Sequence, residues 1–152
     1  MNEEKSDGKF QIKMRIGCED LLPKFAHEGD AARDLHSRTN QRIFPGEIKL
    51  IQTGVFMAIP IGFEFQIRPR SGLALKHGIT ITNAQGTIDS GYRGEIGVIL
   101  QNCSDYKIFE IKYGDRIAQG VICKIPNLTL EVVKELPDSK RGDRGFGSTG
   151  VA

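Results

Sequence analysis

The sequence of 152 residues contains no tryptophan, only three cysteines, and no apolar run long enough to cross a membrane. Cys18, Cys103 and Cys123 are too few and too widely spaced for a disulfide framework or a paired-cysteine metal site. We therefore expect three buried or half-buried free thiols in a reducing compartment. Residues 1–5 lack the apolar stretch of a signal peptide, which favours the cytoplasm, although an organellar transit peptide removed earlier would leave no trace.

Charge is nearly balanced along the chain. The 21 Lys and Arg residues stand against 19 Asp and Glu residues, which gives a formal net charge of +2. This balance argues against a protein that holds long nucleic acid by charge alone, and a mean hydropathy of −0.28 argues against a membrane protein. Since 39% of the residues are hydrophobic, the chain can still build a core. We expect neither nucleic acid nor a membrane among its partners.

Glycine is abundant, with 18 copies, and favours tight turns between short strands over a helical bundle. Alternating or continuous apolar residues predict strands in seven segments. These segments are 10–16, 63–68, 79–82, 94–100, 106–111, 117–125 and 128–132. Only Ser71 to His77, followed by Gly78, predicts a helix with a glycine stop. The predicted fold class is all-β, an antiparallel sandwich or jelly roll with one short helix.

The composition changes after Pro137. Residues 1–137 carry the strand pattern and form the predicted β domain. Residues 138–152 contain too little apolar content to pack on their own, and we expect a flexible C-terminal arm there.

Several catalytic signatures are missing. The sequence has no phosphate-binding G-x-x-x-x-G-K-[ST] loop, no H-E-x-x-H pair and no G-x-S-x-G elbow. His27, His36 and His77 are scattered and are expected on the surface or in turns. A metal site built by the protein itself therefore has little support.

Two segments stand out against this background. Residues 68–74 follow a predicted strand and open the helix, and two arginines with a serine hydroxyl there can form an anion site, or simply a surface turn. Residues 83–94 form a glycine-punctuated loop between strands, whose tip holds Asp89 and Tyr92. A lone aspartate in a turn usually caps the backbone. The company of Tyr92 and Arg93 at the same tip favours a functional role instead.

Two further segments complete the set. In residues 114–119 a Gly-Asp turn leads into a buried strand, where Asp115 and Arg116 are expected to be structural and Gln119 needs a hydrogen-bond partner. Residues 141–150 are basic and glycine-rich with one aromatic side chain, Phe146. This segment is either a solvated chain end or a flap whose ring stacks on a flat ligand.

In this order, five segments resemble the motifs of the homotrimeric dUTPase family. They are 30–37, 69–74, 86–94, 114–119 and 141–150. The resemblance extends from about residue 10 to the C-terminus, and five motifs in order are far more specific than any one of them. It implies a jelly-roll-like (β-clip) homotrimer with three active sites, each assembled from all three chains.

The resemblance also implies the reaction. Members of this family hydrolyse dUTP to dUMP and diphosphate, which supplies dUMP for thymidylate synthesis and keeps uracil out of DNA. By this resemblance, Asp89 orients and activates the water that attacks the α-phosphorus in line, and Tyr92 packs under the deoxyribose. The loop backbone reads uracil, with Asn83, Gly86 and Ile88 around the base.

The remaining roles concern the phosphates and the metal. The implied ligands of the α- and β-phosphates are Arg70, Ser71, Gly72 and Gln119. In the arm, Phe146 stacks on uracil, while the implied contacts to the triphosphate come from Arg141, Gly147, Ser148 and Thr149. The expected cofactor is Mg²⁺, held mainly by the triphosphate and water, with Asp34 at most a second-layer partner.

The chain departs from the family pattern at Arg33 and His36, where aromatic or apolar residues are more common, and at Arg144, where glycine is common. Arg144 is either strained in a position that favours positive φ or supplies an extra phosphate contact. The related dCTP deaminases place a catalytic glutamate at the position that Ile99 occupies here, and an aliphatic side chain cannot transfer protons. A nucleotide-binding module without turnover is the other alternative, but it has no need of Asp89.

Overall fold

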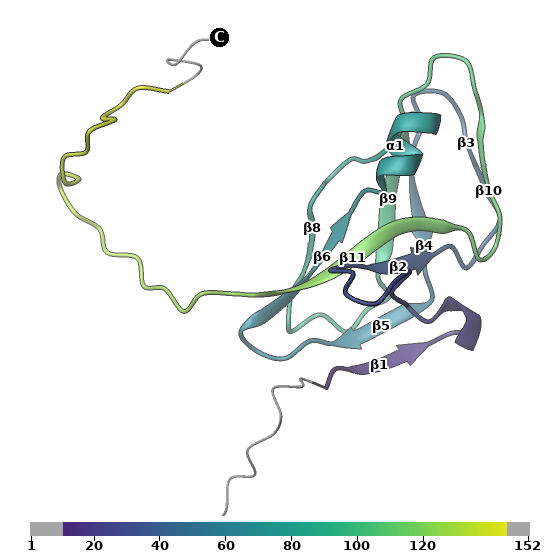
Figure 1. Cartoon of the computed structure of the whole chain (residues 1–152), viewed down its shortest axis with the longest axis horizontal. Helices are drawn as coiled ribbons and strands as arrows, with labels where there is room; N and C mark the ends of the chain where they lie inside the picture. Colours follow the sequence, from purple (N-terminus) through teal and green to yellow (C-terminus); the bar gives the residue numbers. More distant parts are fainter. Residues whose placement is uncertain (1–10, 146–152) are drawn as a thin grey trace, which may run out of the picture.

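The computed structural model describes residues 11–145. Within them the chain forms eleven β-strands, one 3₁₀-helix and one α-helix (Figure 1). In chain order these are β1 (Lys13–Ile16), η1 (Glu19–Leu21), β2 (Arg33–His36), β3 (Gln41–Ile43), β4 (Ile48–Gln52), β5 (Val55–Ala58), β6 (Phe63–Arg68), α1 (Ser71–His77), β7 (Ile79–Ile81), β8 (Gly86–Ile88), β9 (Gly97–Asn102), β10 (Phe109–Ile111) and β11 (Arg116–Lys124).

The strands form four small sheets, and every pair within them is antiparallel. The largest has the order β2-β11-β6-β8, and the next has the order β4-β9-β7. Because neighbours in these sheets are distant in sequence, the chain crosses repeatedly between layers, as jelly rolls do. The predicted all-β, antiparallel, jelly-roll-like class with one short helix is confirmed.

Isoleucine, leucine and valine from most strands fill the space between the sheets. Leu35, Ile51, Ile96 and Val98 are fully buried. Burying each such side chain contributes about 1.5–3 kcal/mol relative to exposure. These β-branched and aliphatic residues suit a pleated surface buried on one face, which is why short strands suffice to form the core.

Helix α1 has the predicted bounds. It begins at Ser71 and ends at His77, and Gly78 adopts a left-handed conformation with φ 65° and ψ 28°. The Gly78 N–H donates to the Ala74 carbonyl at 3.1 Å, which satisfies a backbone group at the end of the helix. The glycine stop thus fixes where the chain leaves α1 for β7.

The loop with Asp89 and Tyr92 connects two strands of one sheet. β7 and β9 pair antiparallel, with Ile81 opposite Leu100, as the flanking strand patterns predicted. Between them β8 joins the other sheet and pairs with β6, so that Ile88 lies opposite Phe65. The loop is therefore attached to both sheets, which positions Asp89 directly after β8.

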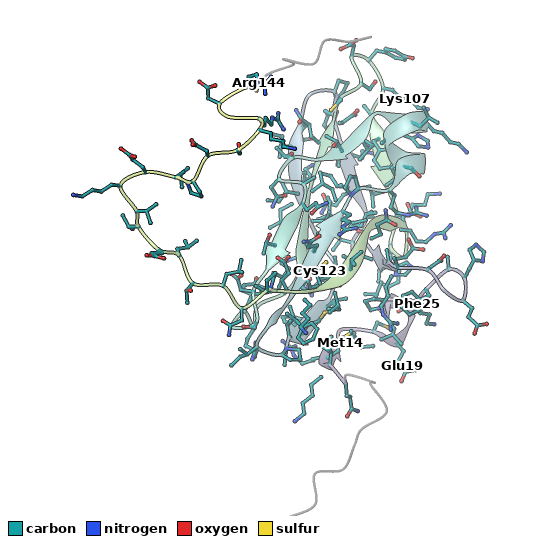
Figure 2. All side chains as sticks on the ribbon, turned by 60° about the vertical axis from the view of Figure 1, so that its left-hand side comes forward. Met14, Glu19, Phe25, Lys107, Cys123 and Arg144 are labelled. Carbon is teal, nitrogen blue, oxygen red and sulfur yellow. The ribbon has the colours of Figure 1, made fainter. Side chains whose placement is uncertain are left out.

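The predicted strand at 128–132 is wrong. After Lys124 the described chain forms no strand, and it runs away from the sheets as an extended arm (Figures 1 and 2). Leu128, Leu130 and Val132 are 76%, 97% and 99% exposed. The alternating pattern is present, but no strand formed by residues 11–145 pairs with it.

Three other expectations need correction. Cys18 and Cys103 are exposed, and only Cys123 is half-buried, because Cys18 and Cys103 lie outside the strands. His36 is a half-buried strand residue rather than a surface or turn residue. The continuous apolar runs in β9 and β11 are typical of strands buried on both faces, but the second face of each is only partly covered. No described helix is long and apolar enough to cross a membrane.

Candidate active site

A cavity of about 510 Å³ opens beside the start of α1. Its walls come from three separate segments, which lie at residues 26–34, 68–72 and 116–121. The strand register explains the convergence, since Gln119 of β11 lies opposite Asp34 of β2 on one side and Arg68 of β6 on the other. The predicted residues Asp34, Arg70, Ser71, Gly72 and Gln119 all line this cavity.

Asp34 is paired with two arginines in this cavity. Its Oδ1 lies 3.1 Å from Arg70 Nε, and its Oδ2 lies 3.3 Å from Arg116 Nη1. The side chains of Asp34 and Arg70 are 15% and 25% exposed. Arg70 Nη1 also donates to the Arg116 carbonyl at 3.1 Å. Asp34 therefore holds both guanidinium groups at the cavity wall, where they can face an anion.

Gln119 has the partner that its half-buried position requires. Its Nε2 donates to the Pro69 carbonyl at 2.9 Å and so ties β11 to the residue before Arg70. A primary amide has two N–H donors. Gln119 can therefore hold the Arg70 segment in place and serve a ligand as well.

Several cavity residues, among them Arg116, His27 and Ala26, were not predicted as site residues. Arg116 lines the cavity, although the sequence indicated a structural role. His27 and Ala26 reach it through a loop that begins at the Lys24–Asp34 bridge. No local sequence pattern reveals this part of the cavity lining, because it depends on which residue of β2 pairs with Lys24.

A second, smaller pocket of about 250 Å³ lies beside the loop after β7. It is lined by the predicted base-site residues Asn83, Gly86, Ile88 and Tyr92, and also by Ile99. Gly86 is buried, and a Cβ there would lie 3.3 Å from Asn83 Nδ2 and 3.5 Å from Ile67 Cβ. The absence of a side chain at Gly86 keeps the backbone close to this pocket.

Tyr92 is 44% exposed, and its hydroxyl donates to the Glu95 carbonyl at 2.9 Å. Its ring lies against Gly94, where a Cβ would collide with the ring and the hydroxyl. Arg93 Nη1 donates to the carbonyls of Ser90 and Tyr92, at 2.6 and 2.8 Å. These hydrogen bonds within the loop hold its backbone in place, and the Tyr92 ring faces solvent.

Asp89 is exposed and is not among the residues that line the arginine cavity of the same chain. Ile88, the residue before it, pairs with Phe65, whereas Arg70 follows Phe65 by five residues. At about 3.3 Å per residue, this extended stretch, which runs past the end of β6 at Arg68, spans about 16 Å. The residues that line the 510 Å³ cavity and those that line the 250 Å³ pocket do not overlap. One chain therefore presents two separate half-sites.

His36 adjoins the first half-site on β2. Its Nδ1 is buried and has no hydrogen-bond partner among the described residues. Burial lowers the pKa of His36, and the nearby positive charges of Arg116, Arg70 and Lys24 lower it further, while Asp34 raises it. His36 is therefore neutral at pH 7.

The arm carries two of the predicted residues within the described part of the chain. Arg141 Nε donates to the Arg144 carbonyl at 2.8 Å, and Arg144 Nε donates to the Arg141 carbonyl at 3.0 Å. Figure 2 labels Arg144 on this arm, well along the chain from Cys123 of β11. The predicted residues Phe146, Gly147, Ser148 and Thr149 lie outside the described residues.

Residues 11–145 bring together no group of three or more His, Cys, Asp or Glu side chains that could hold a metal ion. Acidic side chains near the first half-site are Asp30 and Asp34, and both oxygens of Asp34 face arginines. A metal at this site would need ligands from the substrate and water.

Comparisons with known proteins agree on one family. The dUTPase family model matches residues 20–150. The deoxyuridine 5'-triphosphate nucleotidohydrolase of Picosynechococcus sp. is 54% identical over 131 residues, which cover 86% of this chain and 92% of the relative. The enzyme of the same name from Clostridium tetani is 50% identical over 143 residues, covering 93% of this chain and 98% of that protein.

Solved structures show the same likeness. A mutant dUTPase of Staphylococcus bacteriophage 80alpha, solved with dUpNHpp, has a TM-score of 0.86 at 29% identity and covers 94% of this chain and 100% of its own. A mutant dUTPase from phage phi11 of S. aureus, described with a structural Mg(II) ion, has a TM-score of 0.75 at 27% identity. That match covers 83% of this chain and 98% of the phage chain.

Proposed function

This chain belongs to the dUTPase family and hydrolyses dUTP to dUMP and diphosphate; we propose that Asp89 activates the attacking water in this reaction. Asp89 is an exposed carboxylate beside the pocket that contains Tyr92. A carboxylate in such a position can orient a water and take its proton, which typically contributes about 10²–10⁴-fold to the rate.

The arginine cavity is the proposed triphosphate site. Arg70, Ser71, Gly72 and Gln119 hold the α- and β-phosphates, and Asp34 orients Arg70 for this contact. The support is the paired geometry of Asp34 with Arg70, together with the further arginines 68 and 116 in the cavity lining. Fixed positive charge stabilises the diphosphate as it leaves, because negative charge accumulates on its oxygens.

The smaller pocket is the proposed nucleoside site. Asn83, Gly86 and Ile88 surround uracil, and the loop backbone supplies hydrogen bonds to its polar edge. Tyr92 packs under the deoxyribose and excludes a 2′-hydroxyl. The exposed ring and the close backbone approach at Gly86 support these assignments.

We infer that a complete site needs more than one copy of the chain. Asp89 and Arg70 serve the same triphosphate, yet within one chain Asp89 follows the partner of Phe65, and Arg70 lies about 16 Å of extended chain beyond Phe65. Apolar side chains such as Leu50 and Leu130 are 61% and 97% exposed, which favours burial against another copy. The proposed assembly is a homotrimer that shares its active sites between subunits.

We propose that residues 138–152 form an arm distinct from the β domain of residues 1–137. This arm closes over the bound nucleotide. Phe146 stacks on uracil, while Arg141, Gly147, Ser148 and Thr149 contact the triphosphate. Ordering the arm costs conformational entropy, so it closes only when the ligand offers contacts in return.

The proposed cofactor is Mg²⁺, which would neutralise phosphate charge when bound with the substrate. The donors present fit an ion held by phosphate oxygens and water, with Asp34 at most in the second layer, since its oxygens face two arginines. We place the enzyme in the cytoplasm, where dUMP formation would supply thymidylate synthesis and limit uracil in DNA.

A substrate panel tests the proposal. Release of diphosphate from dUTP, dCTP, dTTP and UTP is measured with Mg²⁺ present. We expect turnover of dUTP far above that of the other three nucleotides. Equal rates on dUTP and UTP would refute the role of Tyr92, and release of ammonia from dCTP would point to a deaminase.

A further inference from the structure

Glu95 closes the loop that carries Asp89 and Tyr92, and it contacts two different parts of the molecule. Its carbonyl oxygen accepts the Tyr92 hydroxyl at 2.9 Å. Its carboxylate Oε1 accepts the Gly54 N–H at 2.8 Å, and Oε2 lies 3.3 Å from Arg38 Nη1. A single residue thus connects the aromatic ring to the turn between β4 and β5.

The next residue is attached to the same turn by its own hydrogen bonds. The Ile96 N–H donates to the Val55 carbonyl at 2.8 Å, and the Ile96 carbonyl accepts the Thr53 hydroxyl at 2.5 Å. Ile96 and Thr53 are both fully buried. The base of the loop therefore stays in place without the Glu95 carboxylate. The Glu95 carbonyl, which accepts the Tyr92 hydroxyl, shares a planar peptide with the Ile96 N–H. The carboxylate adds a second attachment of residue 95 to the same turn, through the Gly54 N–H.

The ring of Tyr92 depends on this acceptor because little else holds it. Tyr92 is 44% exposed, and the residue against which its ring lies, Gly94, has no side chain. Arg93 fixes the carbonyls of Ser90 and Tyr92, which orients the backbone but not the ring. Glu95, by contrast, is only 19% exposed in its side chain and lines the same pocket as Tyr92.

We propose that Glu95 is a positioning residue that sets the discrimination of this enzyme between deoxyribose and ribose. It acts through the chain of contacts from the Gly54 N–H to its carboxylate, and from its carbonyl to the Tyr92 hydroxyl. The inference rests on the proposed role of Tyr92 under the sugar. If the Tyr92 ring is free to shift, it leaves room for a 2′-hydroxyl. Loss of the Glu95 contacts therefore lowers the selectivity for dUTP over UTP more than it lowers the rate of the chemical step.

Steady-state kinetics on dUTP and UTP test this with five variants. In Glu95→Ala, the ratio of kcat/KM for dUTP to that for UTP falls about tenfold, because a hydrogen bond to a charged group is lost. For dUTP the change appears mainly in KM. The midpoint of thermal unfolding falls by a few degrees, because the part-buried Gly54 N–H loses its acceptor. Glu95→Gln keeps an oxygen for the Gly54 N–H and restores most of the ratio. Tyr92→Phe removes the hydroxyl alone and lowers the ratio as Glu95→Ala does.

Arg38→Ala is the matched control. It removes the other partner of the carboxylate, which is 40% exposed, and changes the ratio less than about twofold, as expected of a surface pair. A parental ratio in Tyr92→Phe, or in a folded Glu95→Ala, overturns the proposal. Tyr92→Ala tests the proposed function of Tyr92 separately from the role of Glu95. If it also keeps the parental ratio, the proposed contact of Tyr92 with the sugar is itself wrong.

Discussion

The carboxylate of Asp34 and the guanidinium of Arg70 form an ion pair, with Oδ1 3.1 Å from Nε, at the wall of the cavity beside α1. Asp34 lies in β2, and Arg70 lies two residues after β6, directly before α1. They meet because β2 and β6 both flank β11. An arginine held in this way loses less conformational freedom when it binds an anion. The pair therefore prepares the cavity for a triphosphate before any ligand enters.

Asp34→Asn tests whether Asp34 orients Arg70 before the triphosphate binds. The variant removes the negative charge and leaves Arg70 less firmly oriented, so KM for dUTP rises about tenfold while kcat changes less. Steady-state kinetics measure both constants. Glu110→Gln is the control, since it weakens the exposed pair of Arg42 with Glu110 at 3.1 Å, away from the cavity, and leaves both constants unchanged. An unchanged KM in Asp34→Asn would show that Arg70 needs no such partner.

Asp89→Asn separates chemistry from binding. We expect kcat to fall by about 10²-fold or more, because the amide cannot take a proton from water. The affinity for dUTP, measured by calorimetric titration in the variant, stays close to that of the parent. Asp89 is exposed, so unfolding is not expected to change. Near-parental turnover would require a different base.

Gly120→Ala tests the packing of the main sheet. A Cβ at Gly120 would collide with the Phe65 ring, which is only 1% exposed and has no room to move. We expect the free energy of unfolding to fall by about 1–3 kcal/mol, as in other overpacked cores. Urea denaturation measures the loss. Gly145→Ala serves as the control, because a Cβ there meets nothing within 4 Å, and it leaves stability unchanged.

The pH dependence of stability tests the burial of His36. Burial lowers its pKa in the folded state below the value of about 6.5 for an unfolded chain. The unfolded state therefore binds more protons as pH falls below about 6.5, and the folded state loses stability in that range. His36→Gln cannot titrate, so the difference in unfolding free energy between pH 7.5 and 5.5 becomes smaller. An equally steep dependence in the variant would assign it to other groups.

Local patterns in the sequence predicted the parts of this fold that are determined by residues close to one another in the chain. The bounds of α1 follow from Gly78, and the alternation at residues 63–68 predicted the whole of β6. Five strands were not predicted, β2, β3, β4, β5 and β8, although they carry core residues such as Ile43 and Ile51. Their apolar residues lie beside turns and mixed polar residues, which obscure the period.

The site itself depends on strand register, which a single sequence does not reveal. The sequence grouped Gln119 with its neighbours at 114–118, but its contacts are with Asp34 in register and with Pro69 through its amide. The alternation at 128–132 is real, yet a strand requires a partner, and one chain supplies none for the exposed Leu130. Contacts between two copies of a chain produce no periodic pattern in its sequence.

Complementation between two inactive variants tests the central claim most directly. Arg70→Ala damages the arginine cavity, and Asp89→Asn damages the loop of the other half-site. The two proteins are mixed in equal amounts, unfolded and refolded together, and assayed for diphosphate release from dUTP. Each site would combine the cavity of one chain with the loop of another. About a quarter of all sites in the refolded mixture should therefore be intact, and activity returns. A mixture as inactive as either variant alone would contradict the shared site.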